Sequence, residues 1–260
     1  MEASADLRTT FNEYPEQYNL FRPTYPDRLF DALVTTANIT NTSKLLEIGP
    51  GTGQATKPLA QLGADITGIE LGAELAEKAR TELQQYPNVR ITTGSFEAAA
   101  LPDSSYDLIF SATAFHWIED EDKFLKAARL LKPEGWLAII HTEHVSDDNG
   151  DEFYQASQSI YSKYWPSNTA PLSPPSIDQL RAPYIDEQLF EPKSFTVFPE
   201  TLVYSAAEYA GLLSTYSPTI ALPPDKRQGF LADIASLITE RFGNRLEKQF
   251  AFTLAIAQKK

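Results

Sequence analysis

Three glycines at alternate positions, preceded by an acid, carry the clearest chemical signal in the chain. Gly49, Gly51 and Gly53 follow directly after the apolar run 45–48, in which Glu47 is the single charged residue. Glycine lets the backbone turn sharply at the end of a strand and approach a ligand closely, because it has no Cβ and adopts positive φ at little cost. The pattern predicts a loop that binds a nucleotide cofactor.

A second acid, Glu70, stands where a doubly wound sheet places a ribose-binding carboxylate. Residues 54–62 predict a helix that ends at Gly63, and residues 65–69 predict a strand directly before Glu70. A carboxylate at this strand tip can accept hydrogen bonds from both ribose hydroxyls. The alternatives are that Glu70 is only a helix-start acid, and that Glu47 is a strand-end carboxylate satisfied by backbone N–H groups.

The spacing of the glycines distinguishes between two classes of cofactor. A dinucleotide fingerprint, G-x-G-x-x-G, needs a third glycine where this chain has Gln54 or Thr56. The observed pattern E-x-G-x-G-x-G instead resembles the first motif of the class I S-adenosylmethionine-dependent methyltransferases. S-adenosylmethionine has no pyrophosphate, so Glu47 is expected on the side of its ammonium group, with Gly49 and Gly51 near the methionine part.

Composition bounds the remaining possibilities. The 260 residues are 42% hydrophobic, which is enough for one full α/β core. We expect a cytoplasmic protein, because no apolar run is long enough to span a bilayer and the N-terminus lacks a signal pattern. The absence of cysteine excludes disulfides, thiolate metal sites and cysteine nucleophiles. A net charge of −13 disfavours nucleic acid and anionic membranes, so we expect a small-molecule acceptor, with the oligomeric state left open between monomer and homodimer.

Strands and helices alternate along the first half of the chain. Further helices are expected over 6–20, 26–37, 72–86 and 120–131, and further strands over 89–92, 106–111 and 136–142. This alternation predicts a doubly wound α/β fold with a mostly parallel sheet. Beyond it, we expect helices over 151–164, 205–213 and 225–242 and strands over 195–203 and 250–257.

We therefore expect one domain over 1–260. Its parts are a helical cap over 1–40, a cofactor-binding core over 41–144, a lid or insertion over 145–187 and a C-terminal completion of the sheet over 188–260. The proline-rich segment after residue 165 is too irregular for helix or central strand, and Trp165 is the expected anchor of the lid.

Several segments extend the resemblance to small-molecule methyltransferases related to the trans-aconitate enzymes and to a related, uncharacterised bacterial branch. They are Tyr18, 22–26, 45–53, 94–97, 106–117 and 212–218. The resemblance implies a Rossmann-like sheet of seven strands, whose antiparallel last strand lies beside the fifth. Where many relatives have an adenine-binding aspartate, this chain has Ser95, and the backbone N–H of Phe96 is expected to reach the adenine ring instead. The residues expected to bind the cofactor are Glu47, Gly49, Gly51, Gly53, Glu70, Ser95, Phe96, Ser111, Arg22 and Tyr18.

Two ring side chains follow the fourth expected strand. Ligands of open α/β sheets lie beyond the carboxyl ends of the strands, which places His116 and Trp117 at the mouth of the site. Methyl transfer from a sulfonium is an in-line displacement that depends mainly on positioning. We expect Trp117 to shape the acceptor pocket and His116 to orient the acceptor or act as its base. The alternative is an apolar plug with a structural histidine.

Other candidate groups are assigned weaker roles. His141, Glu143 and His144 lack a fourth ligand and metal-site spacing, so no metal is expected. Arg22 is expected to neutralise a carboxylate of cofactor or acceptor, or else to form a surface or capping pair. The expected tyrosines of the acceptor pocket, which alternatively belong to the core, are Tyr14, Tyr18, Tyr25 and Tyr216. A solvated, basic helix face is expected from Lys123, Lys126, Arg129 and Lys132.

These patterns predict methyl transfer from S-adenosylmethionine, with S-adenosylhomocysteine as product, to a small molecule. The resemblance alone favours O-methylation of a carboxylate or hydroxyl. Two alternatives remain open from the sequence: a nicotinamide-dependent oxidoreductase of similar architecture, and a non-catalytic regulator that binds S-adenosylmethionine.

Overall fold

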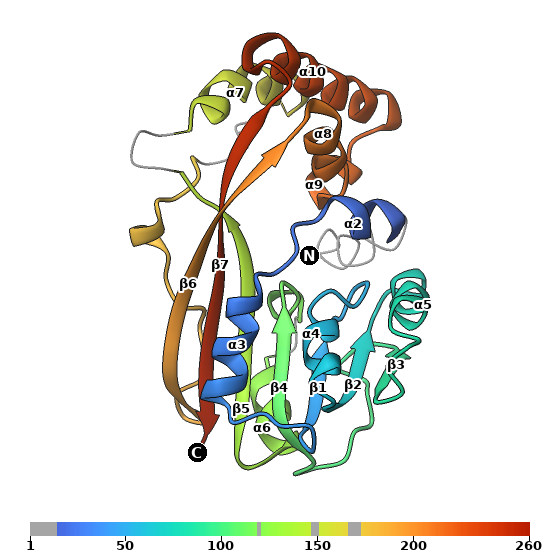
Figure 1. The fold of residues 1–260 in the computed structure, drawn as a ribbon, viewed down its shortest axis with the longest axis vertical. Helices are drawn as coiled ribbons and strands as arrows, with labels where there is room; N and C mark the ends of the chain where they lie inside the picture. The colour runs from blue at the N-terminus through green and yellow to red at the C-terminus, as the bar shows by residue number, and fades with distance from the viewer. Residues whose placement is uncertain (1–14, 119–120, 147–150, 166–172) are drawn as a thin grey trace. The chain divides into compact units, whose positions relative to one another are not determined.

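Seven strands form one sheet in the computed structural model, which describes residues 15–118, 121–146, 151–165 and 173–260 (Figure 1). The strand order is β3-β2-β1-β4-β5-β7-β6. The strands are β1 (Lys44–Ile48), β2 (Asp65–Glu70), β3 (Val89–Thr93), β4 (Tyr106–Ala112), β5 (Leu131–His144), β6 (Phe190–Tyr204) and β7 (Leu246–Lys259).

The first five strands are parallel, and the last strand is antiparallel to the fifth. Strand β1 pairs in parallel with β2 and β4, and the pairs β2–β3 and β4–β5 are also parallel. After β5, the N–H of Val145 donates to the carbonyl of Gln249 near the start of β7, whereas Lys259 at the end of β7 donates to the carbonyl of Leu131 at the start of β5. The expected seven-stranded sheet, with its last strand inserted beside the fifth, is confirmed.

Helices follow β1, β2 and β4 and cover both faces of the sheet, because the crossovers run outward from β1 in opposite directions. Strand β3 connects to β4 without a helix. The helices are α2 (Pro15–Phe21), α3 (Asp27–Thr36), α4 (Thr56–Gln61), α5 (Ala73–Glu82), α6 (Lys123–Leu130), α7 (Glu152–Tyr164), α8 (Ala206–Ser214), α9 (Ser217–Ile220) and α10 (Pro224–Phe242), with 3-10 turns η2 (Phe115–Trp117) and η3 (Ile177–Gln179).

Several elements differ from the sequence-based expectation. Strand β5 begins at Leu131 and β7 at Leu246, whereas strands were expected from residues 136 and 250. Strand β6 begins at Phe190 and runs through Pro192 and Pro199, whereas a strand was expected only from residue 195. As the outermost strand, β6 tolerates proline, because an edge position does not require every N–H for pairing. Helix α9 was not expected, because its four residues are too few to show a helical period.

The chain divides into two compact units, each with its own contacts. Unit 1 comprises residues 1–23, 143–180 and 199–251, and unit 2 comprises residues 24–142, 181–198 and 252–260. The core of unit 2 contains apolar side chains of β1, β4 and β5 together with Phe124, Ala127 and Leu130 of α6. Helix α6 is therefore anchored against the sheet by its buried face.

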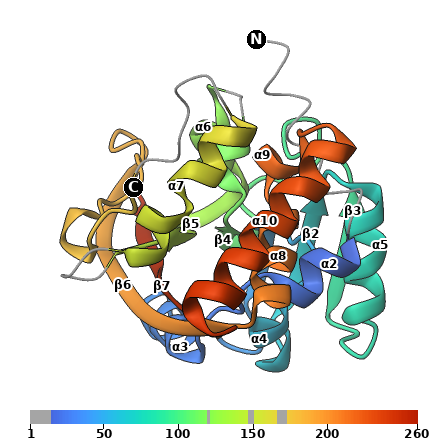
Figure 2. The same ribbon diagram turned by 90° about the horizontal axis from the view of Figure 1, so that it is seen from above.

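Unit 1 has an aromatic core. Helix α10 packs against α8 and α7 (Figure 2). The ring of Phe230 on α10 lies 4.9 Å from that of Trp165 and 5.2 Å from that of Tyr161. Lys248 and Asp151 form a buried ion pair. Among the described residues, no helix is long and apolar enough to cross a membrane.

Candidate active site

The loop after β1 has a backbone that only glycine adopts easily. Gly49, Gly51 and Gly53 have φ values of +70°, +59° and +93°. A Cβ added at Gly49 would lie 2.4 Å from the Cβ of Ala114, and one added at Gly53 would lie 2.8 Å from a methyl carbon of Leu83. The three glycines are therefore required by conformation, and two of them also by close approach.

Glu70 connects this loop to the start of α5. The carboxylate is buried at the tip of β2, and its two oxygens accept hydrogen bonds from the N–H groups of Gly51 and Gly72, both at 2.8 Å. Burial raises the pKa of Glu70, and the backbone N–H groups oppose that rise. Because a carboxylate has about four lone-pair positions, Glu70 can still accept hydrogen bonds from a ligand. Glu70 therefore binds the backbone at the start of α5, as the alternative role expects, and still has lone pairs for a ligand.

Glu47 is fully buried with half of its carboxyl group unsatisfied. One oxygen accepts a hydrogen bond from Thr56 Oγ1 at 2.6 Å, and Oε1 has no hydrogen-bond partner among the described residues. Burial, with a smaller contribution from the charge of Glu70, raises the pKa of Glu47 to about 8. The donor to Glu47 is thus a side-chain hydroxyl, not the backbone N–H groups of the alternative interpretation. A buried oxygen without a partner fits a ligand that brings a cationic donor, such as an ammonium group.

The loop after β3 lies beside Glu70. The N–H of Gly94 donates to the carbonyl of Glu70 at 2.8 Å. Ser95 is half-buried and its hydroxyl accepts from the N–H of Ala98, while the side chain of Phe96 is buried in the core of unit 2. The structure therefore brings Ser95 and Phe96 into the same neighbourhood as the glycine loop and Glu70.

Ser111 braces the end of β1. It is fully buried on β4, and its hydroxyl donates to the carbonyl of Ile48 at 2.8 Å, directly before Gly49. This position fixes the strand end from which the glycine loop departs.

The rings of His116, Trp117 and His141 lie close together near the ends of β4 and β5. The ring of His116, on η2, lies 5.0 Å from that of Trp117 and 5.4 Å from that of His141. His116 is exposed on one side, but loss of solvent contact, with the nearby His141 and Lys123, lowers its pKa to about 4. Burial also lowers the pKa of His141. Both imidazoles are therefore neutral at physiological pH.

Tyr25 contributes to the same unit. Its hydroxyl lies 3.2 Å from Thr113 Oγ1 in the turn after β4, and its ring packs 5.7 Å from that of Phe252. Thr113 has a φ of +57°, unusual for a β-branched residue. The tyrosine therefore supports a strained turn two residues before η2.

Arg22 and Tyr216 belong to unit 1. The guanidinium of Arg22 donates from Nε to Thr215 Oγ1 and from Nη2 to the carbonyl of Thr215, both at 2.9 Å, and lies 4.4 Å from the Tyr216 ring. Thr215 is the C-cap of α8, so these contacts match the capping alternative for Arg22. Tyr18 lies on α2, but its side chain and all of Tyr14 are outside the described residues.

The histidines of β5 do not converge. His141 faces His116 in unit 2, whereas His144 Nε2 lies 2.7 Å from the Tyr216 hydroxyl in unit 1. Burial, with the charges of Lys248 and Arg22, lowers the pKa of His144 to about 3. No group of three histidine or acidic side chains with metal-binding geometry occurs in the part of the chain that the structure describes.

The expectation of a solvated basic face on α6 is wrong for three of its members. Lys132 lies in β5, beyond the end of the helix, and pairs with Asp107 at 2.7 Å. The ammonium of Lys123 donates to the carbonyls of Phe115 and Ile118, at 3.4 and 2.9 Å. The ammonium of Lys126 donates to the carbonyls of Phe96, Glu97 and Ala99. Backbone carbonyls carry no residue-type signal, so these contacts could not be recognised in the sequence.

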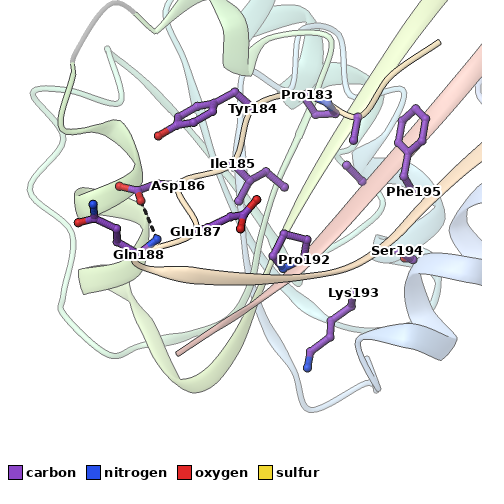
Figure 3. A pocket seen from close by; sticks show the side chains of 12 residues that line it. Pro183, Tyr184, Ile185, Asp186, Glu187, Gln188, Pro192, Lys193, Ser194 and Phe195 are labelled. Carbon is purple, nitrogen blue, oxygen red and sulfur yellow. Dashed lines mark hydrogen bonds between the residues drawn. The ribbon is translucent and has the colours of Figure 1, made fainter. Parts of the chain in front are cut away.

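A separate hollow of about 780 Å³ lies in unit 2 beside β6 (Figure 3). Tyr184, Ile185 and Phe195 form part of its lining. Two of its charged side chains are engaged locally: Asp186 accepts from the N–H of Gln188, and Lys193 pairs with Glu191. The lining of the hollow contains none of the residues expected to bind a cofactor.

Comparisons with known proteins agree with the geometry of the glycine loop. The family model described as a methyltransferase domain matches residues 46–139. An uncharacterized methyltransferase of Schizosaccharomyces pombe is 26% identical over 235 residues, which cover 88% of this chain and 87% of the relative. An uncharacterized methyltransferase of Geobacillus is 30% identical over 173 residues, which cover 55% of this chain and 80% of the relative.

A solved structure shares the fold over nearly the whole chain. It comes from Anaeromyxobacter dehalogenans, is described as a candidate type II methyltransferase, and has a TM-score of 0.60 and 21% identity, covering 92% of this chain and 97% of that structure. Together with the glycine loop and the buried acids near the ends of β1 and β2, these similarities assign both the cofactor and the reaction class. The chain belongs to the class I S-adenosylmethionine-dependent methyltransferases.

Proposed function

We propose that this enzyme methylates a small molecule on oxygen, with a carboxylate favoured over a hydroxyl. The observation that carries the choice is the group of neutral rings at the ends of β4 and β5. When bound, S-adenosylmethionine supplies an electrophilic methyl group to the acceptor. The residues of the chain must hold the acceptor in line and exclude water.

The cofactor end of the proposed site lies after β1, β2 and β3. Gly49, Gly51 and Gly53 provide close backbone approach, and Glu47 offers its unpartnered oxygen to the ammonium group. Glu70 accepts from the ribose hydroxyls. Ser95 and Phe96 flank the adenine ring, and Ser111 braces the loop. We retain Arg22 and Tyr18 as weaker candidates, because the guanidinium of Arg22 donates to Thr215 within unit 1.

The acceptor end supports a substrate that is already ionised. A base whose conjugate acid has a pKa of about 4 is poorly matched to a hydroxyl of pKa about 10. A carboxylic acid of pKa about 4 is an anion at neutral pH and needs no base. His116 therefore serves best by orienting the acceptor, with Trp117 beside it as a wall. The net charge of −13 supports a small acceptor rather than a nucleic acid.

Family membership supports neither of the other functions that the sequence left open. A nicotinamide-dependent oxidoreductase would need the dinucleotide fingerprint, and a non-catalytic regulator has no specific observation in its favour. The similarity to trans-aconitate enzymes and the role of residues 145–187 as a lid remain predictions.

An acceptor panel with S-adenosylmethionine carrying a radioactive methyl group tests the proposal. The panel contains carboxylic acids, phenols and amines of similar size. Methyl esters release methanol in mild base, whereas ethers and methylamines do not, so base-labile counts identify a carboxylate acceptor. Turnover that appears only with amines, or only as base-stable product, would contradict the proposal.

A further inference from the structure

We propose that Lys126 and Lys123 of α6 are positioning residues for methyl transfer: Lys126 holds the loop that flanks the adenine ring, and Lys123 holds the turn that carries His116 and Trp117. The inference rests on the proposed assignment of these two segments to the site. All the groups involved belong to unit 2.

Lys126 uses its full donor capacity on one loop. An ammonium group has three N–H donors. The distances from Nζ to the carbonyl oxygens of Phe96, Glu97 and Ala99 are 2.6, 2.9 and 2.9 Å, and Nζ lies 5.0 Å from the centre of the Phe96 ring. Three carbonyls directed at one cation cannot turn independently, so Lys126 restrains the backbone of this loop.

That conformation sets the direction of the N–H expected to reach adenine. The carbonyl of Ser95 accepts from the N–H of Ala99 at 3.1 Å. In a planar trans peptide, the N–H of Phe96 points opposite to the Ser95 carbonyl. The contacts of Lys126 with residues 96–99 therefore hold this N–H away from the interior of the turn.

Lys123 acts in the same way on η2. Its ammonium donates to the carbonyl of Ile118, directly after the turn, and to that of Phe115, which also accepts from the N–H of Ile118. A cation at a helix C-terminus also interacts favourably with the partial negative charge there. Burial lowers the pKa of Lys123, and the acid Glu97 on the neighbouring loop opposes that change.

The two lysines share a rigid platform. They stand three residues apart on α6 and therefore on one helix face. Phe124 and Ala127 of the same helix are buried in the core of unit 2, which fixes the helix relative to the sheet. Arg129 continues the basic face, but it pairs with the carboxylate of Asp103, at 3.2 Å, rather than with either site loop. Arg129 is thus a matched control.

The test compares Lys126→Met, Lys123→Met and Arg129→Met by calorimetric titration with S-adenosylhomocysteine and with 5′-methylthioadenosine, which lacks the amino-acid part. Lys126→Met should weaken both ligands by the same factor, about tenfold or more, since each charge-assisted hydrogen bond contributes substantially. Arg129→Met should bind both ligands as the wild type does. Wild-type affinity in Lys126→Met would overturn the role of Lys126.

Lys126→Arg keeps the charge and the donors and should retain most of the affinity. If Lys126→Met does not fold, Lys126→Gln provides the comparison, with a loss of affinity larger than that of Lys126→Arg. Equal affinities of Lys126→Gln and wild type would then contradict the inference.

The effect of Lys123→Met is measured as a change in the pKa of His116. The groups that lower the pKa of His116 are its burial, His141 on β5 and Lys123 on α6. In Lys123→Met, NMR titration of the histidine rings, assigned with His116→Gln, should show a higher pKa for His116 and the wild-type pKa for His144. Affinity for S-adenosylhomocysteine should stay within about twofold, because the cofactor loop is held by Lys126. An unchanged pKa of His116 would overturn the role of Lys123.

Glu70→Gln separates this inference from the proposed function. If Glu70→Gln weakens S-adenosylhomocysteine and Lys126→Met does not, the cofactor site stands and the inference falls. If neither change weakens the ligand, the proposed cofactor site itself is wrong.

Discussion

The loops that follow β1 and β2 differ from the turn that follows β4 in what they offer a ligand. The first region presents backbone N–H groups and two buried acids, Glu47 and Glu70, one with a free oxygen and one bound to two N–H groups. The second presents rings, His116, Trp117 and His141, with no charge at neutral pH. Both belong to unit 2, and Ser111 connects them through the carbonyl of Ile48.

This contrast explains how one fold can keep its cofactor and vary its substrate. Backbone groups at positive φ recognise a ligand by close approach, so substitutions of these glycines should weaken cofactor binding strongly. Rings form a wall whose shape changes with each side chain, while the main-chain turn that carries them remains. Substitutions in the first region should therefore have large effects, and those in the second region smaller ones.

The largest effect is expected for Gly49→Ala, which affects both regions. The new Cβ would meet the Cβ of Ala114, in the turn before η2, at 2.4 Å, and the backbone at φ +70° is unfavourable for alanine. We expect a loss of about 3 kcal/mol or more in the free energy of unfolding, with loss of S-adenosylhomocysteine binding. Thermal unfolding and calorimetry measure the two effects.

Gly243→Ala is the matched control for Gly49→Ala. Gly243, at φ +61°, ends α10, and a Cβ added there would have no atom within 4 Å. It should cost only about 1 kcal/mol and leave cofactor affinity unchanged. Equal losses in the two variants would show that the approach of Ala114 to the glycine loop has no special importance.

The sequence identified the first region better than the second for a physical reason. Close backbone approach requires glycine, and a ribose contact requires an acid at a strand tip, so Gly49 and Glu70 are visible as residue types at set spacing. The roles of Lys123 and Lys126 depend on backbone carbonyls, which every residue has. Their partners are up to 30 residues distant in sequence, so only the fold reveals them. The early start of β6 was missed for a similar reason, because its prolines are tolerated only at the edge of a sheet.

The next effect in size is expected for Glu70→Ala. It removes the acceptor for two backbone N–H groups and for the ribose hydroxyls, so S-adenosylhomocysteine should bind more weakly by about 2 kcal/mol or more. Calorimetric titration measures the change. Since the ring region has no contact with this carboxylate in the proposed site, the NMR pKa of His116 should be the same in variant and wild type. Retained affinity would place the ribose elsewhere.

Glu47 should make cofactor binding and stability depend on pH. The folded protein holds the Glu47 proton up to a pKa of about 8, against 4.5 ordinarily, so its contribution to the free energy of unfolding falls as pH rises toward 8. The slope approaches about 1.4 kcal/mol per pH unit between the two values. The histidines, whose pKa values are lowered in the folded protein, add an opposite slope up to about pH 7.5, because unfolded imidazoles still bind protons there, but this slope is the same in wild type and in Glu47→Gln. The difference between the free energies of unfolding of wild type and Glu47→Gln, measured with denaturant, should therefore fall as pH rises from about 5 to about 8.

The same proton should be released when the cofactor's ammonium group reaches Glu47. Near pH 7, S-adenosylhomocysteine should release close to one proton, measured by calorimetry in buffers of different ionisation enthalpy. 5′-Methylthioadenosine, which has no ammonium group, should release none, and neither ligand should release a proton from Glu47→Gln. Equal proton release by the two ligands would locate the ionising group away from the methionine part.

The smallest effect is expected for His116→Ala, and its form depends on the acceptor. With a carboxylate, the imidazole only positions the substrate, so turnover should fall by about tenfold while affinity for S-adenosylhomocysteine is retained. Because the pKa of His116 is lowered to about 4, the rate of both enzymes at saturating S-adenosylmethionine should be flat between about pH 6 and 9. With a hydroxyl, the wild-type rate would instead rise with pH as the acceptor itself ionises. His116→Gln, which keeps a hydrogen-bonding group, should recover part of the turnover if orientation is the role. Full activity of His116→Ala on its true acceptor would assign the histidine to packing against Trp117 and His141, and would leave the shape of the acceptor pocket to the remaining rings.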